Sequence, residues 1–364
     1  MKKGKKMKLT SYTVKDKKFG VIDSDNFKSC VSDVYNFKFN KENGFMMRWG
    51  SKYQDDPDFS PIGPELLDLE ISTGGCKNKC KFCYKNNTDG PPTNMSFDTF
   101  KLIVDKFPAT LGQIAFGITG TQTNPDFIKM MEYCRKIGII PNFTMSGIDL
   151  TQEFAEKAAK LVGALAVSAY QSDKNVCYNA IKMMTDLGLK QTNMHLMICQ
   201  DNIDFVYEVL KDIKEDPRLE KLNAVVFLSL KPKGRAKNNF TPLAIEDFSK
   251  LMKHCMDNDI AFGFDSCGAT KFETSVNNLD IEEKQKENLL SMCEPCESAL
   301  FSFYVNVHGI GFPCSFMEGG SNWDKGIDIK NINDFIKDVW YANEFINWRK
   351  NLINNKRKCP EFII

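Results

Sequence analysis

The chain has 364 residues, of which 42% are apolar and 26% are charged, and its formal net charge is +1. This composition is typical of a globular protein with about two domains, and the near-neutral charge gives no reason to expect bulk nucleic acid or a membrane surface as a partner. No run approaches the ~18 apolar residues that cross a bilayer. Because the start also lacks a signal-peptide pattern, we expect a cytoplasmic protein.

Residues 1–64 are expected to form a β-rich extension. Two β-prone runs flank Asn43-Gly44 in the stretch YNFKFNKENGFMMRWG, which is typical of a β-hairpin. The Pro-rich stretch DDPDFSPIGP then reads as a linker to the next domain.

From residue 66 onward, short apolar runs alternate with segments of helical periodicity. The expected strands cover 66–72, 113–118, 141–146, 164–170, 191–198, 224–230 and 260–265. The expected helices cover 96–107, 125–138, 150–162, 176–188, 202–214 and 244–258. This alternation predicts βαβ units and a parallel sheet. Since the strands are apolar almost throughout, we predict a full or partial (β/α) barrel over residues 65–265, with its chemistry at the carboxyl ends of the strands.

Three cysteines follow the first of these strands, in GGCKNKCKFCYK. In the cytosol, thiols this close together more often bind metal or act in catalysis than form disulfides, and the total of 13 cysteines is odd. Cys76, Cys80 and Cys83 supply three thiolates from one loop. Structural zinc usually takes four ligands from paired motifs, so an iron–sulfur cluster with one open iron is the better match.

The spacing Cys-x3-Cys-x-aromatic-Cys, with Phe82 as the aromatic residue, resembles the signature of the radical S-adenosylmethionine (radical SAM) superfamily. The resemblance covers about residues 66–265 and implies a partial TIM-type (β/α)6 barrel. It further implies that a [4Fe–4S] cluster binds S-adenosylmethionine through its open iron and cleaves it to a 5′-deoxyadenosyl radical, which abstracts hydrogen from a substrate. An electron donor such as flavodoxin or ferredoxin is implied as a partner.

The resemblance also suggests where S-adenosylmethionine binds. The family carries a Gly-Gly-Glu motif after the second strand, and the matching stretch here is GITGTQTNPDF, residues 117–127, which lacks the Glu. A small hydroxyl residue often ends the fourth strand in the family. Polar residues on one face of the expected strands 141–146 and 191–198 are further candidates. The expected cofactor-binding residues are Phe82, Gly117, Thr119, Gly120, Gln122, Thr144, Ser146, Ser168 and Asn193.

Further site candidates come from their positions on the strands. His195 shares a strand face with Asn193 and is either catalytic or a satisfied core histidine. Lys231 and Arg235 follow the sixth strand in KPKGRA, where they are expected to bind an anionic substrate group, unless this is a basic surface turn. Cys267 is a candidate catalytic thiol, and the nearby Asp265 is a further catalytic candidate.

The last hundred residues carry a second cysteine pattern. Cys296-x12-Gly309-x4-Cys314 resembles the opening of SPASM and twitch domains, the auxiliary cluster modules of many radical SAM enzymes. The resemblance implies a Cys-rich domain over residues 266–364 with one auxiliary [4Fe–4S] cluster. The expected ligands are Cys293, Cys296, Cys314 and Cys359. Cys267 is an alternative ligand, and zinc is an alternative metal.

Three functions remain open on these observations. The first is a radical SAM enzyme that modifies a peptide or protein side chain by crosslinking, epimerisation or dehydrogenation. The second is a radical SAM enzyme that acts on a small molecule or nucleotide. The third is a non-catalytic iron–sulfur or zinc protein, which an open three-thiol site at a barrel mouth favours least.

Overall fold

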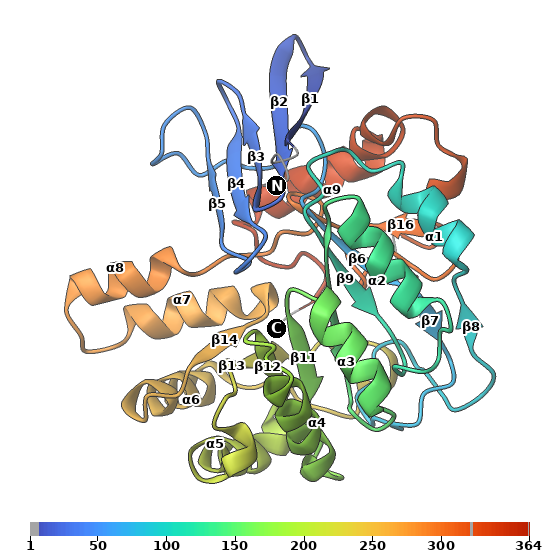
Figure 1. Cartoon of the computed structure of the whole chain (residues 1–364). Helices are drawn as coiled ribbons and strands as arrows, with labels where there is room; N and C mark the ends of the chain where they lie inside the picture. Colours follow the sequence, from blue (N-terminus) through green and yellow to red (C-terminus); the bar gives the residue numbers. More distant parts are fainter. Residues whose placement is uncertain (1–6, 321–322, 363) are drawn as a thin grey trace, which may run out of the picture.

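The computed structural model describes residues 7–320, 323–362 and 364. Its N-terminal part is a five-stranded antiparallel sheet in the order β1-β2-β3-β4-β5 (Figure 1). The strands are β1 (Met7–Val14), β2 (Lys17–Ser24), β3 (Phe27–Val31), β4 (Asn36–Asn40) and β5 (Met46–Trp49). The predicted hairpin around Asn43-Gly44 is confirmed, because β4 and β5 pair antiparallel, with Asn36 opposite Trp49.

Six βα units and a closing strand follow within the described residues. The strands are β6 (Leu66–Glu70), β9 (Gln113–Gly117), β10 (Ile140–Met145), β11 (Leu165–Ser168), β12 (Thr192–Ile198), β13 (Ala224–Ser229) and β14 (Phe262–Phe264). The helices between them are α1 (Phe97–Val104), α2 (Phe127–Lys136), α3 (Gln152–Leu161), α4 (Lys174–Asp186), α5 (Ile203–Glu215) and α6 (Ile245–Asp257). All neighbouring pairs from β6 to β14 are parallel, which confirms the predicted α/β architecture.

The C-terminal residues extend the same sheet. Strand β15 (Ser302–Val305) pairs parallel with β6, and β16 (Ile310–Phe312) and β17 (Ile327–Asp328) continue it antiparallel. The ten-stranded sheet therefore runs in the order β14-β13-β12-β11-β10-β9-β6-β15-β16-β17. The remaining elements are α7 (Ala269–Asn277), α8 (Glu283–Ser291), α9 (Asn343–Asn354) and the short pair β7 (Ser72–Thr73) and β8 (Thr93–Asn94).

The N-terminal sheet covers the amino ends of the barrel strands. Its buried Phe37 and Phe39 pack in one cluster with Ile140 at the start of β10, Phe301 just before β15 and Leu352 of α9. These barrel residues lie at the strand ends opposite to the expected site. The extension therefore closes the bottom of the barrel and leaves the carboxyl ends of the strands to the rest of the chain (Figure 1).

Arg48 of β5 ties this extension to the barrel and to the tail. Its Nε lies 2.6 Å from Oε2 of Glu65, directly before β6, and its Nη2 lies 2.5 Å from Oε1 of Glu297, which precedes β15. Both Arg48 and Glu65 are largely buried. A buried ion pair adds little net stability over an apolar pair, but removing one partner leaves an uncompensated charge.

Among the described helices, none has the length and apolar character that crossing a membrane requires.

Arg48→Ala leaves the buried carboxylate of Glu65 and the partly buried carboxylate of Glu297 without their cation. It should lower the free energy of unfolding by about 3–5 kcal/mol. Urea unfolding at neutral pH measures this loss. The control is Lys157→Ala, which breaks an exposed helix ion pair with Glu153 and should cost at most about 0.5 kcal/mol. A loss below about 1 kcal/mol for Arg48→Ala would contradict the central role of this contact.

Candidate functional site

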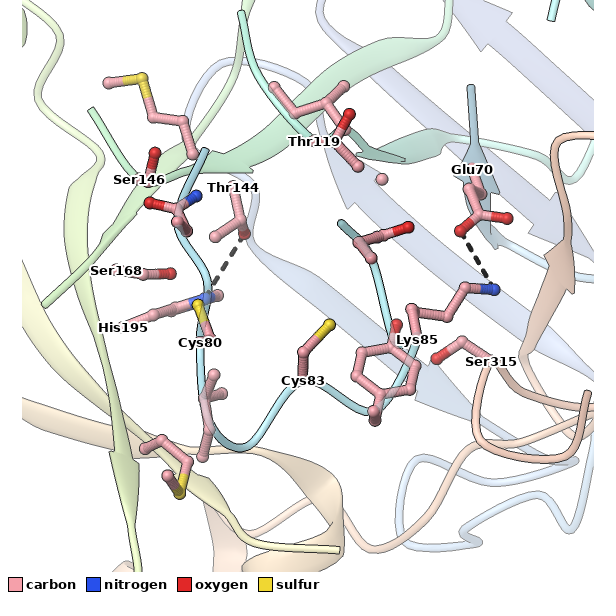
Figure 2. Close-up of a pocket in the computed structure, with 18 of the residues that line it drawn as sticks. Glu70, Cys80, Cys83, Lys85, Thr119, Thr144, Ser146, Ser168, His195 and Ser315 are labelled. Atoms are coloured by element: carbon pink, nitrogen blue, oxygen red, sulfur yellow. Dashed lines mark hydrogen bonds and ion pairs between the residues drawn. The ribbon is translucent and has the colours of Figure 1, made fainter. Parts of the chain in front are cut away.

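A cavity of about 600 Å³ opens at the carboxyl ends of the barrel strands. Its lining includes all three cysteines of the first motif and residues from seven strands of the ten-stranded sheet. Figure 2 shows Cys80 and Cys83 between two groups of polar side chains, one around Thr144, Ser168 and His195 and the other around Glu70 and Lys85. The parallel register places these residues together, because the strands all end at the same side of the sheet.

The loop that carries Cys76, Cys80 and Cys83 is bent by two glycines. Gly74 and Gly75 have φ values of 71° and 59°, and a Cβ at Gly74 would lie 2.7 Å from the carbonyl oxygen of Pro91. A side chain at position 74 is therefore excluded by both conformation and space. The loop turns back sharply after β6 and brings its thiols over the barrel mouth.

Arg235 holds this loop by its backbone. Its Nε donates to the carbonyl oxygen of Cys80 and its Nη1 to that of Asn87, both at 2.9 Å. A Cβ at the neighbouring Gly234 would lie 2.5 Å from the carbonyl oxygens of Cys83 and Tyr84, so the two segments touch. We predicted that Arg235 binds substrate, but the structure gives it a different role, since it supports the Cys loop and does not line the cavity.

The three thiols are suited to an iron–sulfur cluster. All are free and partly exposed toward the cavity. Burial raises the pKa of the Cys80 thiol, and the adjacent Cys76 and Cys83 raise it further, so a bound positive metal centre would favour the thiolate form of Cys80. In the described residues, no three His, Cys, Asp or Glu side chains converge tightly enough for one metal ion. A cluster binds each thiolate through a different iron and needs no such convergence.

The first polar wall comes from β10, β11 and β12. Burial lowers the pKa of His195 to about 4, against a smaller opposite effect of Asp265, so the imidazole is neutral at physiological pH. Its Nδ1 lies 3.4 Å from Oγ1 of Thr144. The cavity lining also includes the predicted residues Phe82, Gly117, Thr119, Gly120, Ser146 and Ser168.

Two predicted cofactor contacts lie elsewhere. Asn193 stands at the start of β12 and accepts a 2.8 Å hydrogen bond from Asn223. Residues at the amino end of a parallel strand lie at the end of the barrel opposite to the cavity. The structure therefore argues against a cofactor contact from Asn193. Gln122 lines a smaller neighbouring cavity together with Gly120 and Ser146.

Lys231 lines the cavity, but its positive charge is already balanced by a neighbouring carboxylate. It is buried, forms an ion pair with Asp265, and its Nζ lies 5.0 Å from the ring centre of Phe316. Cys267 is not among the residues that line the main cavity. Burial raises the pKa of its thiol well above the usual range, while Lys231 lowers it. A catalytic role of Cys267 therefore receives no support from its position.

The second polar wall was not predicted from sequence. Lys85 Nζ lies 3.0 Å from Oε1 of Glu70 and donates to Tyr304 Oη at 2.7 Å, and it also pairs with Glu318. Tyr304 Oη donates in turn to Glu70 Oε2 at 3.2 Å. The sequence feature that could have predicted this wall is the alternation in LLDLE, where Asp68 and Glu70 place acidic side chains on one face of an otherwise apolar strand.

The segment after Cys314 lies on the Cys loop. The rings of Phe316 and Tyr84 stack with their centres 4.3 Å apart, and Lys233 Nζ donates to the carbonyl oxygens of Phe316 at 2.8 Å and Glu318 at 2.5 Å. These contacts bring three segments together: the segment after Cys314, the loop that carries the first cysteine motif, and the turn after β13 that carries Lys233.

The tail cysteines lie close to this segment. Burial raises the pKa of Cys314 to about 11, and Cys359 contributes to this rise. Burial likewise raises the pKa of Cys296 to about 12, with smaller contributions from Cys314 and Cys359. Cys293 Sγ instead lies 3.7 Å from the carbonyl oxygen of Ala269. The ligand set of an auxiliary cluster, with Cys293 or Cys267 as its fourth member, stays a prediction.

Asp68 is the site residue with the strongest consequence for pH. Burial raises its pKa to about 7, and the nearby Glu297 adds to the shift. The usual aspartate pKa is about 3.9, so the folded chain holds this proton more tightly than the unfolded chain. The folded state therefore loses stability as the pH rises from about 4 to about 7.

Asp68→Asn should remove this loss. The advantage of the variant over the wild-type chain in free energy of unfolding should grow by roughly 1–3 kcal/mol between about pH 5 and about pH 7.5. Urea titrations across this range measure it. Asp33→Asn, at an exposed carboxylate, should follow the wild-type curve. A constant difference between Asp68→Asn and wild type over the whole range would show that Asp68 has an ordinary pKa.

Comparison with known proteins agrees with this site. Residues 71–213 match the family model described as the radical SAM superfamily. A curated protein of Pyrococcus furiosus, the tungsten-containing aldehyde ferredoxin oxidoreductase cofactor-modifying protein, is 34% identical over 101 residues, which are 27% of this chain and 28% of that protein. The chain thus matches less than a third of this relative's length.

Two solved structures show the fold over most of the chain. SuiB of Streptococcus suis bound to the precursor peptide SuiA superposes with a TM-score of 0.65 and 13% identity, covering 90% of each chain. The structure anSMEcpe with bound AdoMet and the Cp18Cys peptide gives a TM-score of 0.58 and 16% identity, covering 82% of this chain and 86% of that one. The chain therefore contains a domain of the radical SAM superfamily over residues 71–213, within a fold that it shares with these structures.

Proposed function

We propose that this chain is a radical SAM enzyme that removes a hydrogen atom from a peptide or protein side chain, leading to crosslinking, epimerisation or dehydrogenation. The observation that carries the proposal is the meeting of three free thiols at the mouth of a 600 Å³ cavity inside the domain that matches the superfamily.

In this proposal Cys76, Cys80 and Cys83 hold a [4Fe–4S] cluster with an open iron. When bound there and reduced by the electron donor, the cluster would supply the one electron that cleaves S-adenosylmethionine to methionine and a 5′-deoxyadenosyl radical. The glycines and hydroxyl groups of Gly117, Thr119, Gly120, Thr144, Ser146 and Ser168 bind S-adenosylmethionine. Neutral His195 orients it or the substrate by hydrogen bonding.

The substrate class rests on a likeness of fold. The similar structures of SuiB and anSMEcpe hold peptides, as their names state, and the cavity lies between the barrel mouth and the segment that follows Cys314. We assign residues 1–64, 65–265 and 266–364 to an extension, a barrel and an auxiliary cluster domain. A cytosolic flavodoxin or ferredoxin as electron donor is part of the same proposal.

A second candidate is a small-molecule substrate. The curated relative is named as a cofactor-modifying protein and is 34% identical over its 101 matched residues. An enzyme of this kind would bind a cofactor precursor or nucleotide in the same cavity.

Cleavage of S-adenosylmethionine tests the reaction type. Anaerobically reconstituted chain with dithionite should form 5′-deoxyadenosine, and the triple variant Cys76→Ala, Cys80→Ala, Cys83→Ala should form none. Cys255→Ala, a buried thiol of α6, should retain the wild-type rate. The triple variant should still hold about four irons per chain, from one further cubane cluster in the tail. Cleavage by the triple variant at the wild-type rate would refute the triad as the site, and zinc or no metal in that variant would refute the tail cluster.

Turnover of peptides tests the substrate class. The reconstituted chain is incubated with S-adenosylmethionine, dithionite and a set of synthetic peptides that together present all twenty side chains. Mass spectrometry should detect a loss of hydrogen or a new crosslink in some peptides, and no change with the triple cysteine variant. If nucleotides or cofactor precursors react under the same conditions while the peptides do not, the small-molecule candidate replaces the peptide proposal.

A further inference from the structure

Asp68 is an acidic side chain of the cavity without a partner. Strand β6 alternates, so Leu67 and Leu69 are fully buried in the core behind the sheet, while Asp68 and Glu70 line the cavity on the other face. In the described parts of the chain, no side-chain hydrogen bond or ion pair is formed by the Asp68 carboxylate.

The other charged side chains of the cavity wall are paired. Glu70 is bound by Lys85 and Tyr304, and Lys231 is bound by Asp265. The charge whose field acts on Asp68 is that of Glu297, which is acidic as well. When ionised, Asp68 therefore gives its part of the cavity a negative charge that no described side chain pairs with.

The surroundings of Asp68 also leave room for a ligand. Its neighbours in register on the two adjoining strands are Tyr304 of β15 and Ala115 of β9. Ala115 lines the cavity too, and its small side chain leaves the space beside the carboxylate open. Asp68 is half-buried. Removing an ionised carboxylate from water without a partner is costly, and the cost is relieved when a cation or an N–H donor reaches it.

We propose that Asp68 is a substrate-binding residue and that it binds an amine or guanidinium group of the substrate. The inference rests on the proposed function and narrows it, because it specifies a basic side chain, lysine or arginine, at or beside the position that reacts. The Asp68 carboxylate accepts N–H hydrogen bonds from this group and fixes the position of its carbon chain below the Cys loop.

Binding of small probes tests this without turnover. The probes are butylguanidinium and butylammonium, which mimic arginine and lysine side chains, and the neutral butanol. Isothermal titration is carried out on the reconstituted chain with S-adenosylmethionine present and no reductant, so that nothing is consumed. At about pH 8, where Asp68 is charged, both cations should bind Asp68→Asn at least about tenfold more weakly than wild type, and butanol should bind both equally.

Two further variants sharpen the result. Asp33→Asn removes an exposed carboxylate that likewise has no side-chain partner among the described residues and should bind all probes as wild type does. Ala115→Leu fills the space beside Asp68 and should weaken binding of all three probes. Equal affinity of wild type and Asp68→Asn for both cations would overturn the inference, and so would butanol binding to wild type as tightly as the cations.

The inference and the proposed function fail separately. Failure of the wild-type chain to form 5′-deoxyadenosine would overturn the reaction type and with it this substrate role. Formation of 5′-deoxyadenosine by a chain that shows no preference for the cations would overturn the role of Asp68 alone.

Discussion

The parallel pairing of β6 with β9 on one side and β15 on the other is the constraint on which the site depends. Strand β6 has Leu66 opposite Gln113 and Ser302, and this register sets which residues face the core and which face the cavity. After β6, the short strand β7 leads into the Gly74-Gly75 turn at the start of the first cysteine motif. A shift of one residue would turn Asp68 and Glu70 into the core and the two leucines into the cavity.

The charges in the cavity are arranged so that most of them are neutralised in place. Lys85 lies between Glu70 and Glu318, and Lys231 lies against Asp265. In a poorly solvated site, such pairs hold their side chains in fixed positions at the expense of desolvation. Fixed polar groups suit a reaction in which a reactive radical must meet one carbon atom and no other. Asp68 departs from this pattern, and that departure makes it informative about the substrate.

The two cysteine groups are joined mechanically as well as by their place in the cavity. Phe316 lies two residues after Cys314 and stacks on Tyr84, which directly follows Cys83. Lys233, from the turn after β13, binds the backbone of the same tail segment. The N-terminal sheet is held at the other end of the barrel by Arg48. The tail therefore contacts the Cys loop directly, whereas the N-terminal sheet contacts the barrel at Glu65 and the tail at Glu297.

The amino-acid sequence by itself determined the local features of this protein. The alternation of strands and helices, the hairpin around Asn43-Gly44 and the grouping of three thiols after the first barrel strand all follow from periodicity, turn chemistry and spacing within a few residues. The tertiary structure decided what depends on distant partners. Pairing of β15 with β6 joins residues more than 200 positions apart. Arg235 lies 155 positions from Cys80, and Glu70 lies 234 positions from Tyr304. Periodicity shows which face of a strand is polar, but it does not show which charges meet there. For this reason the sequence identified the cysteines, while only the folded chain showed that Arg235 already binds the Cys loop and that Asp68 has no side-chain partner among the described residues.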